Sequence, residues 1–297
     1  MQRNDAPWTI RRLLEWTTAF FARKEVDSPR LAAELLLSHV LAAPRIRIYT
    51  DYDRVPDEDQ LAIFRDLVRR AGEHEPIAYL TGKAHFFNLE FEVTRDVLIP
   101  RPDTETLVEH VLQHVRFTPG LESPRILELC TGSACIAAAI AHQLKSATIL
   151  AIDISESALA VARRNLDRLN LSDRVILAQG DLYEPLETQI TAAPFDMILA
   201  NPPYIRSADI QALDRNVRDY EPRLALDGGE DGLQITRRIL ATAPRRLVPG
   251  GRVYIEIQFD AADAVRQLAT DAGLQDIRIF RDQAGNDRVL HARKPTA

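Results

Sequence analysis

Cysteine is scarce in this chain of 297 residues, which contains only Cys130 and Cys135. The two stand five positions apart, with no further cysteine to complete a thiolate metal site or a disulfide framework. The low count therefore excludes a disulfide-stapled secreted scaffold and predicts a reducing, cytoplasmic location. We expect no metal site.

Long apolar segments are absent as well. The chain begins MQRNDAPWTIRRLLEW, which contains no apolar signal core. No stretch approaches the roughly 18 apolar residues that a membrane-spanning helix needs. We therefore expect no membrane partner.

Positive charge is in short supply too. The formal net charge is −6, and residues 1–85 carry 13 Lys and Arg against 13 Asp and Glu, so the excess of acid lies in the remainder. Phosphate binding depends on concentrated Lys and Arg. Nucleic acid is therefore an unlikely main partner, whereas an acidic face would suit a basic protein.

The length of the chain and its apolar periodicity predict two folded parts. Helical patterns fill residues 9–22, 28–43 and 57–73, with Ser28 as the cap of the second helix. We expect a helical domain at residues 1–83, a linking β-hairpin at residues 84–100 and an α/β domain at residues 101–297.

A nucleotide-binding pattern opens the α/β part. Residues 125–129 form an apolar strand, residues 130–134 are small, and residues 135–143 form an alanine-rich helix. The next strand, residues 147–152, ends in Asp153. An acidic residue at that place can accept hydrogen bonds from ribose hydroxyls.

Two further strands continue the pattern. Residues 174–178 lead to Gly180-Asp181-Leu182, and residues 195–200 lead to Asn201. Because the carboxyl ends of parallel strands lie at one edge of a sheet, these loops should face a common ligand. The last two strands, residues 274–281 and 286–292, should form an antiparallel edge.

The loop Asn201-Pro202-Pro203-Tyr204 carries the chemistry. Two prolines remove two backbone donors, which leaves carbonyl groups free to face a ligand. The Asn201 side-chain oxygen and the Pro202 carbonyl can hold both hydrogens of a planar NH2 group, and Tyr204 can pack on its face. That arrangement suits alkylation of an amide-like nitrogen, where orientation does most of the catalytic work.

The small-residue loop reads Glu128-x-Cys130-x-Gly132-x-Ala134, which resembles the E/D-x-G-x-G-x-G loop of class I S-adenosylmethionine-dependent methyltransferases. Residues 85–99, Pro100 to Glu105 and the Asn201 loop closely resemble the PrmC/HemK family. The resemblance extends over nearly the whole chain. Cys130, Ala134 and Gln258 replace glycines usual in the family.

The resemblance implies a Rossmann-like seven-stranded α/β methyltransferase sheet with an N-terminal helical domain for substrate recognition. It implies a monomeric enzyme that methylates the glutamine side-chain amide (N5) in the Gly-Gly-Gln motif of class I peptide chain release factors. Asp153 would hold the ribose of S-adenosylmethionine, and Leu182 the adenine. Asn201 would face both substrates. The implied cofactor loop consists of Cys130, Thr131, Gly132, Ser133 and Ala134; the implied catalytic and substrate-binding residues are Asn201, Pro202, Pro203 and Tyr204.

Other interpretations stay open. The chain also resembles enzymes that methylate a glutamine of a large-subunit ribosomal protein, and a base amino-methyltransferase acting on DNA or RNA could share the Asn-Pro-Pro-Tyr loop. The altered glycine loop could mark a binding module without turnover. The helical domain could serve stability alone.

Four further expectations concern individual residues. Cys130 and Ala134 should keep negative φ, since both are small substitutes for glycine. Arg101 and Glu105 should close over the site. His110 and His114 should lie on a solvated helix face, as should the arginine pairs at residues 237–238 and 245–246.

Overall fold

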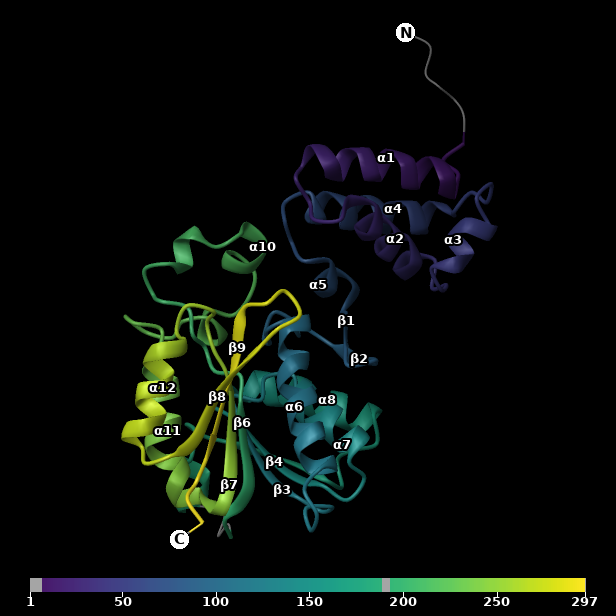
Figure 1. Cartoon of the computed structure of the whole chain (residues 1–297). Helices are drawn as coiled ribbons and strands as arrows, with labels where there is room; N and C mark the ends of the chain where they lie inside the picture. Colours follow the sequence, from purple (N-terminus) through teal and green to yellow (C-terminus); the bar gives the residue numbers. More distant parts are fainter. Residues whose placement is uncertain (1–6, 189–192, 297) are drawn as a thin grey trace. The chain divides into compact units, whose positions relative to one another are not determined.

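The computed structural model describes residues 7–188 and 193–296, which form two compact units (Figure 1). The first, here called the helical unit, comprises the described residues up to Lys83 together with Asp214–Tyr220. The second, the sheet unit, comprises Ala84–Leu213 and the described residues from Glu221 onward.

The helical unit packs its helices around an apolar core of its own. Its helices are α1 (Ile10–Arg23), α2 (Pro29–Val40), α3 (Ile46–Thr50), α4 (Glu58–Ala71) and α5 (Ile77–Thr81). The three longer helices confirm the sequence prediction. Ser28 stands at the N-cap of α2, but its φ is 45° and its side chain makes no capping hydrogen bond. Asp57, by contrast, forms a full capping box with Gln60 at α4.

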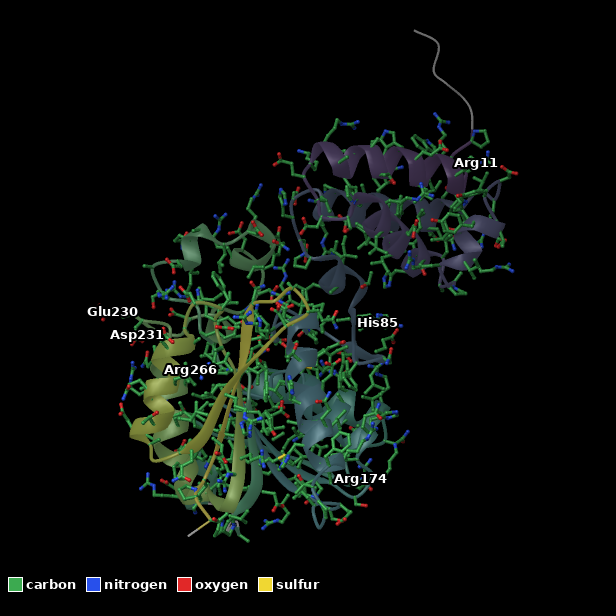
Figure 2. All side chains as sticks on the ribbon, viewed as in Figure 1. Arg11, His85, Arg174, Glu230, Asp231 and Arg266 are labelled. Atoms are coloured by element: carbon green, nitrogen blue, oxygen red, sulfur yellow. The ribbon has the colours of Figure 1, made fainter. Side chains whose placement is uncertain are left out.

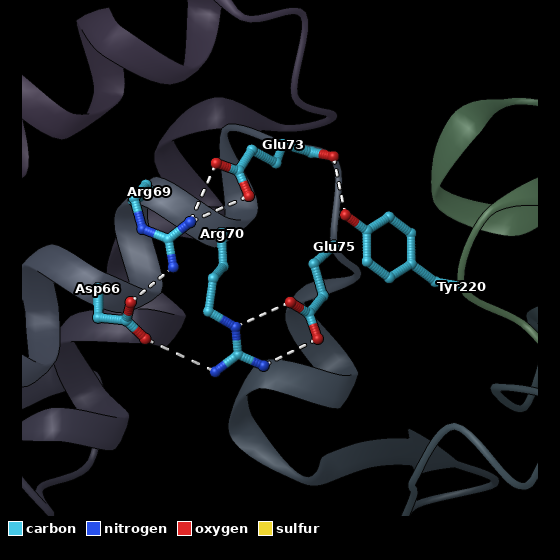
Figure 3. Close-up of polar contacts among 6 residues, drawn as sticks. All are labelled: Asp66, Arg69, Arg70, Glu73, Glu75 and Tyr220. Carbon is cyan, nitrogen blue, oxygen red and sulfur yellow. Dashed lines mark hydrogen bonds and ion pairs between the residues drawn. The ribbon is translucent and has the colours of Figure 1, made fainter.

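A stretch from the second half of the chain completes this unit. Residues 214–220 contain the short helix α10 (Arg215–Arg218), and the Tyr220 hydroxyl donates to the Glu73 carbonyl oxygen at 3.0 Å (Figure 3). Nearby, Arg70 makes two hydrogen bonds of 2.8 Å to the Glu75 carboxylate. The helical unit is therefore assembled from two separate stretches of sequence.

The sheet unit is built on seven strands in the order β5-β4-β3-β6-β7-β9-β8. The strands are β3 (Arg125–Leu129), β4 (Thr148–Asp153), β5 (Val175–Gln179), β6 (Phe195–Ala200), β7 (Leu247–Glu256), β8 (Gln275–Arg281) and β9 (Asp287–Arg293). Strands β3 to β7 pair in parallel, and β9 lies antiparallel between β7 and β8. The predicted sheet and its antiparallel edge are confirmed.

Helices cover both faces of this sheet (Figure 1). One face packs on α6 (Glu105–Arg116), α7 (Cys135–Gln143) and α8 (Glu156–Arg168); the other packs on α11 (Gln234–Arg246) and α12 (Ala262–Asp271). Shorter elements are α9 (Glu184–Thr188), η1 (Pro102–Thr104), η2 (Ile210–Ala212) and η3 (Arg223–Ala225). Among the described residues, no helix is long and apolar enough to cross a membrane.

Polar side chains fix the ends of two of these helices. The Ser155 hydroxyl accepts a hydrogen bond from the Ala158 backbone N–H at 3.2 Å, so the predicted cap of α8 is confirmed. Arg174, labelled in Figure 2, donates to the carbonyl oxygens of Ala141 and Leu144 at 2.6 and 3.2 Å. These bonds satisfy carbonyl groups that the last turn of α7 would otherwise leave free.

The hairpin of β1 (Lys83–Phe86) and β2 (Leu89–Glu92) turns at Phe87 and Asn88, both with positive φ. That geometry is typical of a type I′ turn, in which phenylalanine is an unusual residue. The Glu105 carboxylate accepts the Phe87 backbone N–H at 2.7 Å and so holds the turn. Glu105 therefore supports the hairpin, and the expectation that it closes over the site is wrong.

The two histidines of α6 are not on a solvated face, as the sequence suggested. His110 stacks on Phe280 of β8, with ring centroids 3.6 Å apart, and half-buried His114 lies beside Tyr254. His291 of β9 completes the cluster, 5.1 Å from the Tyr254 ring. Apolar ring surfaces on the sheet cover these imidazoles, so helical spacing alone did not reveal their burial.

The turn after β3 departs from expectation in its backbone. Cys130 and Ala134 have φ values of 59° and 62°, so the prediction of negative φ at both is wrong. Gly132 also has positive φ, at 54°. The turn therefore keeps a path suited to glycine, and Cys130 and Ala134 carry the strain of a left-handed conformation, about 1–3 kcal/mol per residue.

Replacing Ala134 with glycine should relieve this strain. The strain relieved should outweigh the stability lost with one buried methyl group and with the greater conformational entropy of the unfolded state. The free energy of unfolding should therefore rise by up to about 1 kcal/mol. Urea unfolding of Ala134→Gly measures the change. The matched control, Ala139→Gly within α7, should lose about 1 kcal/mol. A loss in both variants would contradict the strain argument.

The buried His291 should make stability depend on pH. Burial lowers the pKa of His291 to about 4, with a further contribution from the charge of Arg252, whose guanidinium donates to the imidazole at 3.1 Å. A His pKa lowered from its ordinary 6.5 contributes stability above pH 6.5 that is lost as pH falls toward 4.

Between pH 7 and 4.5, the protein should therefore lose about 2 kcal/mol more of its free energy of unfolding than a His291→Gln variant, whose amide does not titrate. Urea unfolding at the two pH values measures this difference. Equal losses in both proteins would show that His291 does not resist protonation.

Candidate active site

A pocket of about 320 Å³ lies at the carboxyl ends of β3, β4, β5 and β6. The site residues predicted from sequence that line it are Cys130, Thr131, Gly132, Ser133, Asp153, Leu182, Asn201 and Pro203. Buried Ala134 and Pro202 do not line it, and neither does Tyr204. The four predicted loops thus meet at one cavity.

Asp153 joins two walls of the pocket. Its carboxylate accepts the backbone N–H of Gly132 at 2.8 Å and that of Ser155 at 2.9 Å. Burial raises the pKa of Asp153, which these backbone donors partly offset. Each carboxylate oxygen can accept a further hydrogen bond, so the group can serve both the turn and a ligand hydroxyl.

Buried polar groups surround the turn. The hydroxyls of Thr131 and Ser133 make no hydrogen bond of ordinary geometry to any described residue, although both residues line the pocket. Glu128 beneath them is fully buried, and burial raises its pKa to about 8 despite the nearby Thr131 hydroxyl. Such groups suit a ligand rich in polar atoms.

A pair of charges ties together two segments that line the pocket. Arg101, which lines the pocket, forms a short ion pair with the buried carboxylate of Glu221, and Glu221 also accepts the Ile99 backbone N–H at 3.4 Å. Burial raises the pKa of Glu221, whereas Arg101 lowers it. The pair connects the segment of residues 95–101 to that of residues 222–225, and most residues of both segments line the pocket. No local pattern in the sequence marks Glu221 as a site residue.

Arg238 also has a specific partner. Its guanidinium donates to the Asp181 carboxylate at 2.8 Å, and both residues line the pocket. Arg237 and Arg238 are both exposed, so the predicted solvated face is confirmed, and Arg238 has an acidic partner on it as well. Among the described residues, no group of three or more His, Cys, Asp or Glu could hold a metal ion.

The polar side chains of the loop after β6 hold it through hydrogen bonds to Thr104 and Glu256. The Asn201 side-chain nitrogen donates to the Thr104 hydroxyl at 3.2 Å, and that hydroxyl donates to the Glu256 carboxylate at 2.6 Å. The Tyr204 hydroxyl donates to the same carboxylate at 3.0 Å. Thr104 and Glu256 were missed because nothing local in the sequence links residues so far apart.

A glycine segment supports the backbone of the same loop. Ile205 and Asp227 form a parallel bridge, and Gly228 donates to the Ile205 carbonyl oxygen at 2.8 Å. A Cβ at Gly228 would lie 2.7 Å from Tyr204 Cα and 2.8 Å from the Pro203 carbonyl oxygen. Glycine is required here because the two backbones lie too close for a side chain.

Comparison with protein families and known proteins matches this architecture. Residues 12–82 match the PrmC N-terminal domain, and residues 102–230 match the methyltransferase small domain. A methyltransferase structure from Pyrococcus furiosus has a TM-score of 0.50 and 20% sequence identity, covering 80% of this chain and 100% of that one. That likeness shows the fold alone.

Full-length relatives show the family. The release factor glutamine methyltransferase of Rhodopirellula baltica is 44% identical over 293 residues, which is 98% of each chain. That of Geobacter sulfurreducens is 41% identical over 286 residues, covering 96% of this chain and 97% of the relative. The chain belongs to the family of release factor glutamine methyltransferases.

Proposed function

We propose that this enzyme methylates the side-chain amide of the glutamine in the Gly-Gly-Gln motif of class I peptide chain release factors. S-adenosylmethionine is its methyl donor, and the protein works in the cytoplasm as a monomer. The observation that carries the proposal is the orientation of Asn201. Its side-chain nitrogen is bound to Thr104, so its carbonyl oxygen is the acceptor left for an amide NH2 group.

The pocket fits the methyl donor. The Asp153 carboxylate would accept hydrogen bonds from the ribose hydroxyls, Leu182 would pack on the adenine, and the turn at residues 130–134 would hold the methionine moiety. The buried hydroxyls of Thr131 and Ser133 offer partners to that polar end. When bound, S-adenosylmethionine supplies a methyl group activated by its positively charged sulfur.

The chain's own contribution is orientation. The Asn201 side-chain oxygen and the Pro202 carbonyl oxygen accept the two hydrogens of the glutamine NH2 group, while Tyr204 packs on the planar amide. An amide lone pair is delocalised, so fixing the nitrogen in one position lowers the barrier most. The nitrogen becomes acidic as it gains the methyl group, so its proton passes to water and no strong base is required.

The helical unit recognises the release factor in this proposal. It has a core of its own and balanced charge over residues 1–85, which suits a protein partner better than a polyanion. The excess acidic charge over the rest of the chain would complement a basic substrate. Nucleic acid is not a substrate in this proposal.

Asn201→Ala should reduce turnover at saturating substrate by about 100-fold or more, because the lost acceptor aligns the nitrogen in the transition state. Affinity for S-adenosylmethionine, measured by calorimetry, should change little. Near-full turnover in this variant would show that the loop does not orient the amide.

Asp153→Ala should raise the dissociation constant for S-adenosylmethionine at least about tenfold, because charge-assisted hydrogen bonds to ribose contribute about 1.5–3 kcal/mol each. Calorimetry measures the affinity. A melting curve serves as the control, because Asp153 also holds the backbone of Gly132 and Ser155. Unchanged affinity in a folded variant would place the ribose site elsewhere.

A further inference from the structure

The Thr104 hydroxyl is the only link described between the side chains of Asn201 and Glu256. Thr104 lies at the end of η1, Asn201 follows β6, and Glu256 ends β7. The hydroxyl oxygen lies 3.2 Å from the Asn201 side-chain nitrogen and 2.6 Å from a Glu256 carboxylate oxygen. Thr104 and Glu256 are 2% and 1% exposed, so water cannot replace either bond easily.

The two hydrogen bonds of the Thr104 hydroxyl run in one direction, from Asn201 to Thr104 and from Thr104 to Glu256. A hydroxyl group has a single hydrogen, and the Thr104 hydroxyl directs it to the Glu256 oxygen 2.6 Å away. Thr104 can therefore only accept from its other neighbour, Asn201. Asn201 can satisfy it only through its NH2 group, which turns its carbonyl oxygen away from Thr104.

The same carboxylate holds the second side chain of the loop. The Tyr204 hydroxyl donates to the other oxygen of Glu256 at 3.0 Å. Burial raises the pKa of Glu256 overall, and the two hydroxyl donors and the charge of Arg288 offset only part of that rise. The two polar side chains of the Asn-Pro-Pro-Tyr loop thus converge on one buried carboxyl group, Tyr204 directly and Asn201 through Thr104.

We propose that Thr104 and Glu256 are positioning residues that set the orientation of the Asn201 amide and the place of the Tyr204 ring. Thr104 lines the pocket and Glu256 does not; in this proposal both act by presenting the Asn201 oxygen to the substrate glutamine. This inference rests on the proposed role of Asn201 in methylation. It assigns Thr104 to the reaction rather than to helix packing alone.

The test compares two substitutions of nearly matched size. Thr104→Val keeps the shape of the side chain and removes the hydroxyl, whereas Thr104→Ser keeps the hydroxyl and removes a methyl group. Thr104→Val should lower kcat about 10- to 100-fold, because the Asn201 amide loses its fixed orientation. Thr104→Ser should recover most of that loss, and S-adenosylmethionine affinity should stay within about twofold in both variants.

A second readout does not depend on activity. In protein labelled with ¹⁵N, the Asn201 side-chain NH2 should exchange with water slowly, because one hydrogen is bonded to Thr104. In Thr104→Val that exchange should rise at least about tenfold, while Thr104→Ser should retain protection. Unchanged exchange in Thr104→Val would overturn the proposed hydrogen-bond relay.

Glu256→Gln provides an independent variant if Thr104→Val does not fold. The glutamine NH2 group can donate to Thr104, which lets the hydroxyl donate to the Asn201 oxygen and reverses the amide. This variant should lose kcat as Thr104→Val does, with little change in cofactor affinity. Full turnover in Glu256→Gln would overturn the positioning role.

Asn201→Ala in the same assay distinguishes a failure of the positioning role from a failure of the proposed function. If Asn201→Ala is inactive while Thr104→Val and Glu256→Gln turn over normally, the positioning role fails and the role of Asn201 stands. If Asn201→Ala itself turns over normally, the proposed function of the loop fails first.

Discussion

The register of the central parallel strands is the constraint on which the site depends. Leu129 of β3 pairs with both Ile152 of β4 and Ala200 of β6. The next residues along these three strands are Cys130, Asp153 and Asn201, so the turn after β3, the Asp153 carboxylate and the Asn-Pro-Pro-Tyr loop leave the sheet side by side. A slip of one residue in either pairing would move these groups apart and exchange the faces of the strand.

The carboxyl groups at this edge of the sheet differ in their hydrogen-bond partners. Asp153 holds two backbone N–H groups and faces the pocket, whereas Glu256 receives two hydroxyls beneath the loop. Glu128 has no hydrogen-bond partner of ordinary geometry among the described residues, and burial raises its pKa to about 8. A largely neutral Glu128 at pH 7 avoids placing a second negative charge close to Asp153.

Much of the fold could be predicted from local pattern, and the site only in part. Apolar periodicity located β3, β6 and α7 at their observed bounds, and Ser155 marked the start of α8. The left-handed φ of Cys130 and Ala134 could not be predicted, because tertiary packing imposes a backbone that their side chains disfavour. Thr104 and Glu256 lie 152 residues apart, so only the folded chain shows that they share a hydrogen bond.

Methyl transfer from labelled S-adenosylmethionine tests the central claim most directly. The purified enzyme would be offered a class I release factor, the same factor with its Gly-Gly-Gln glutamine changed to alanine, and duplex DNA and RNA. The account predicts label in the unaltered release factor alone, on the glutamine side-chain nitrogen. Equal labelling of the alanine variant, or transfer to nucleic acid in preference to the release factor, would contradict it.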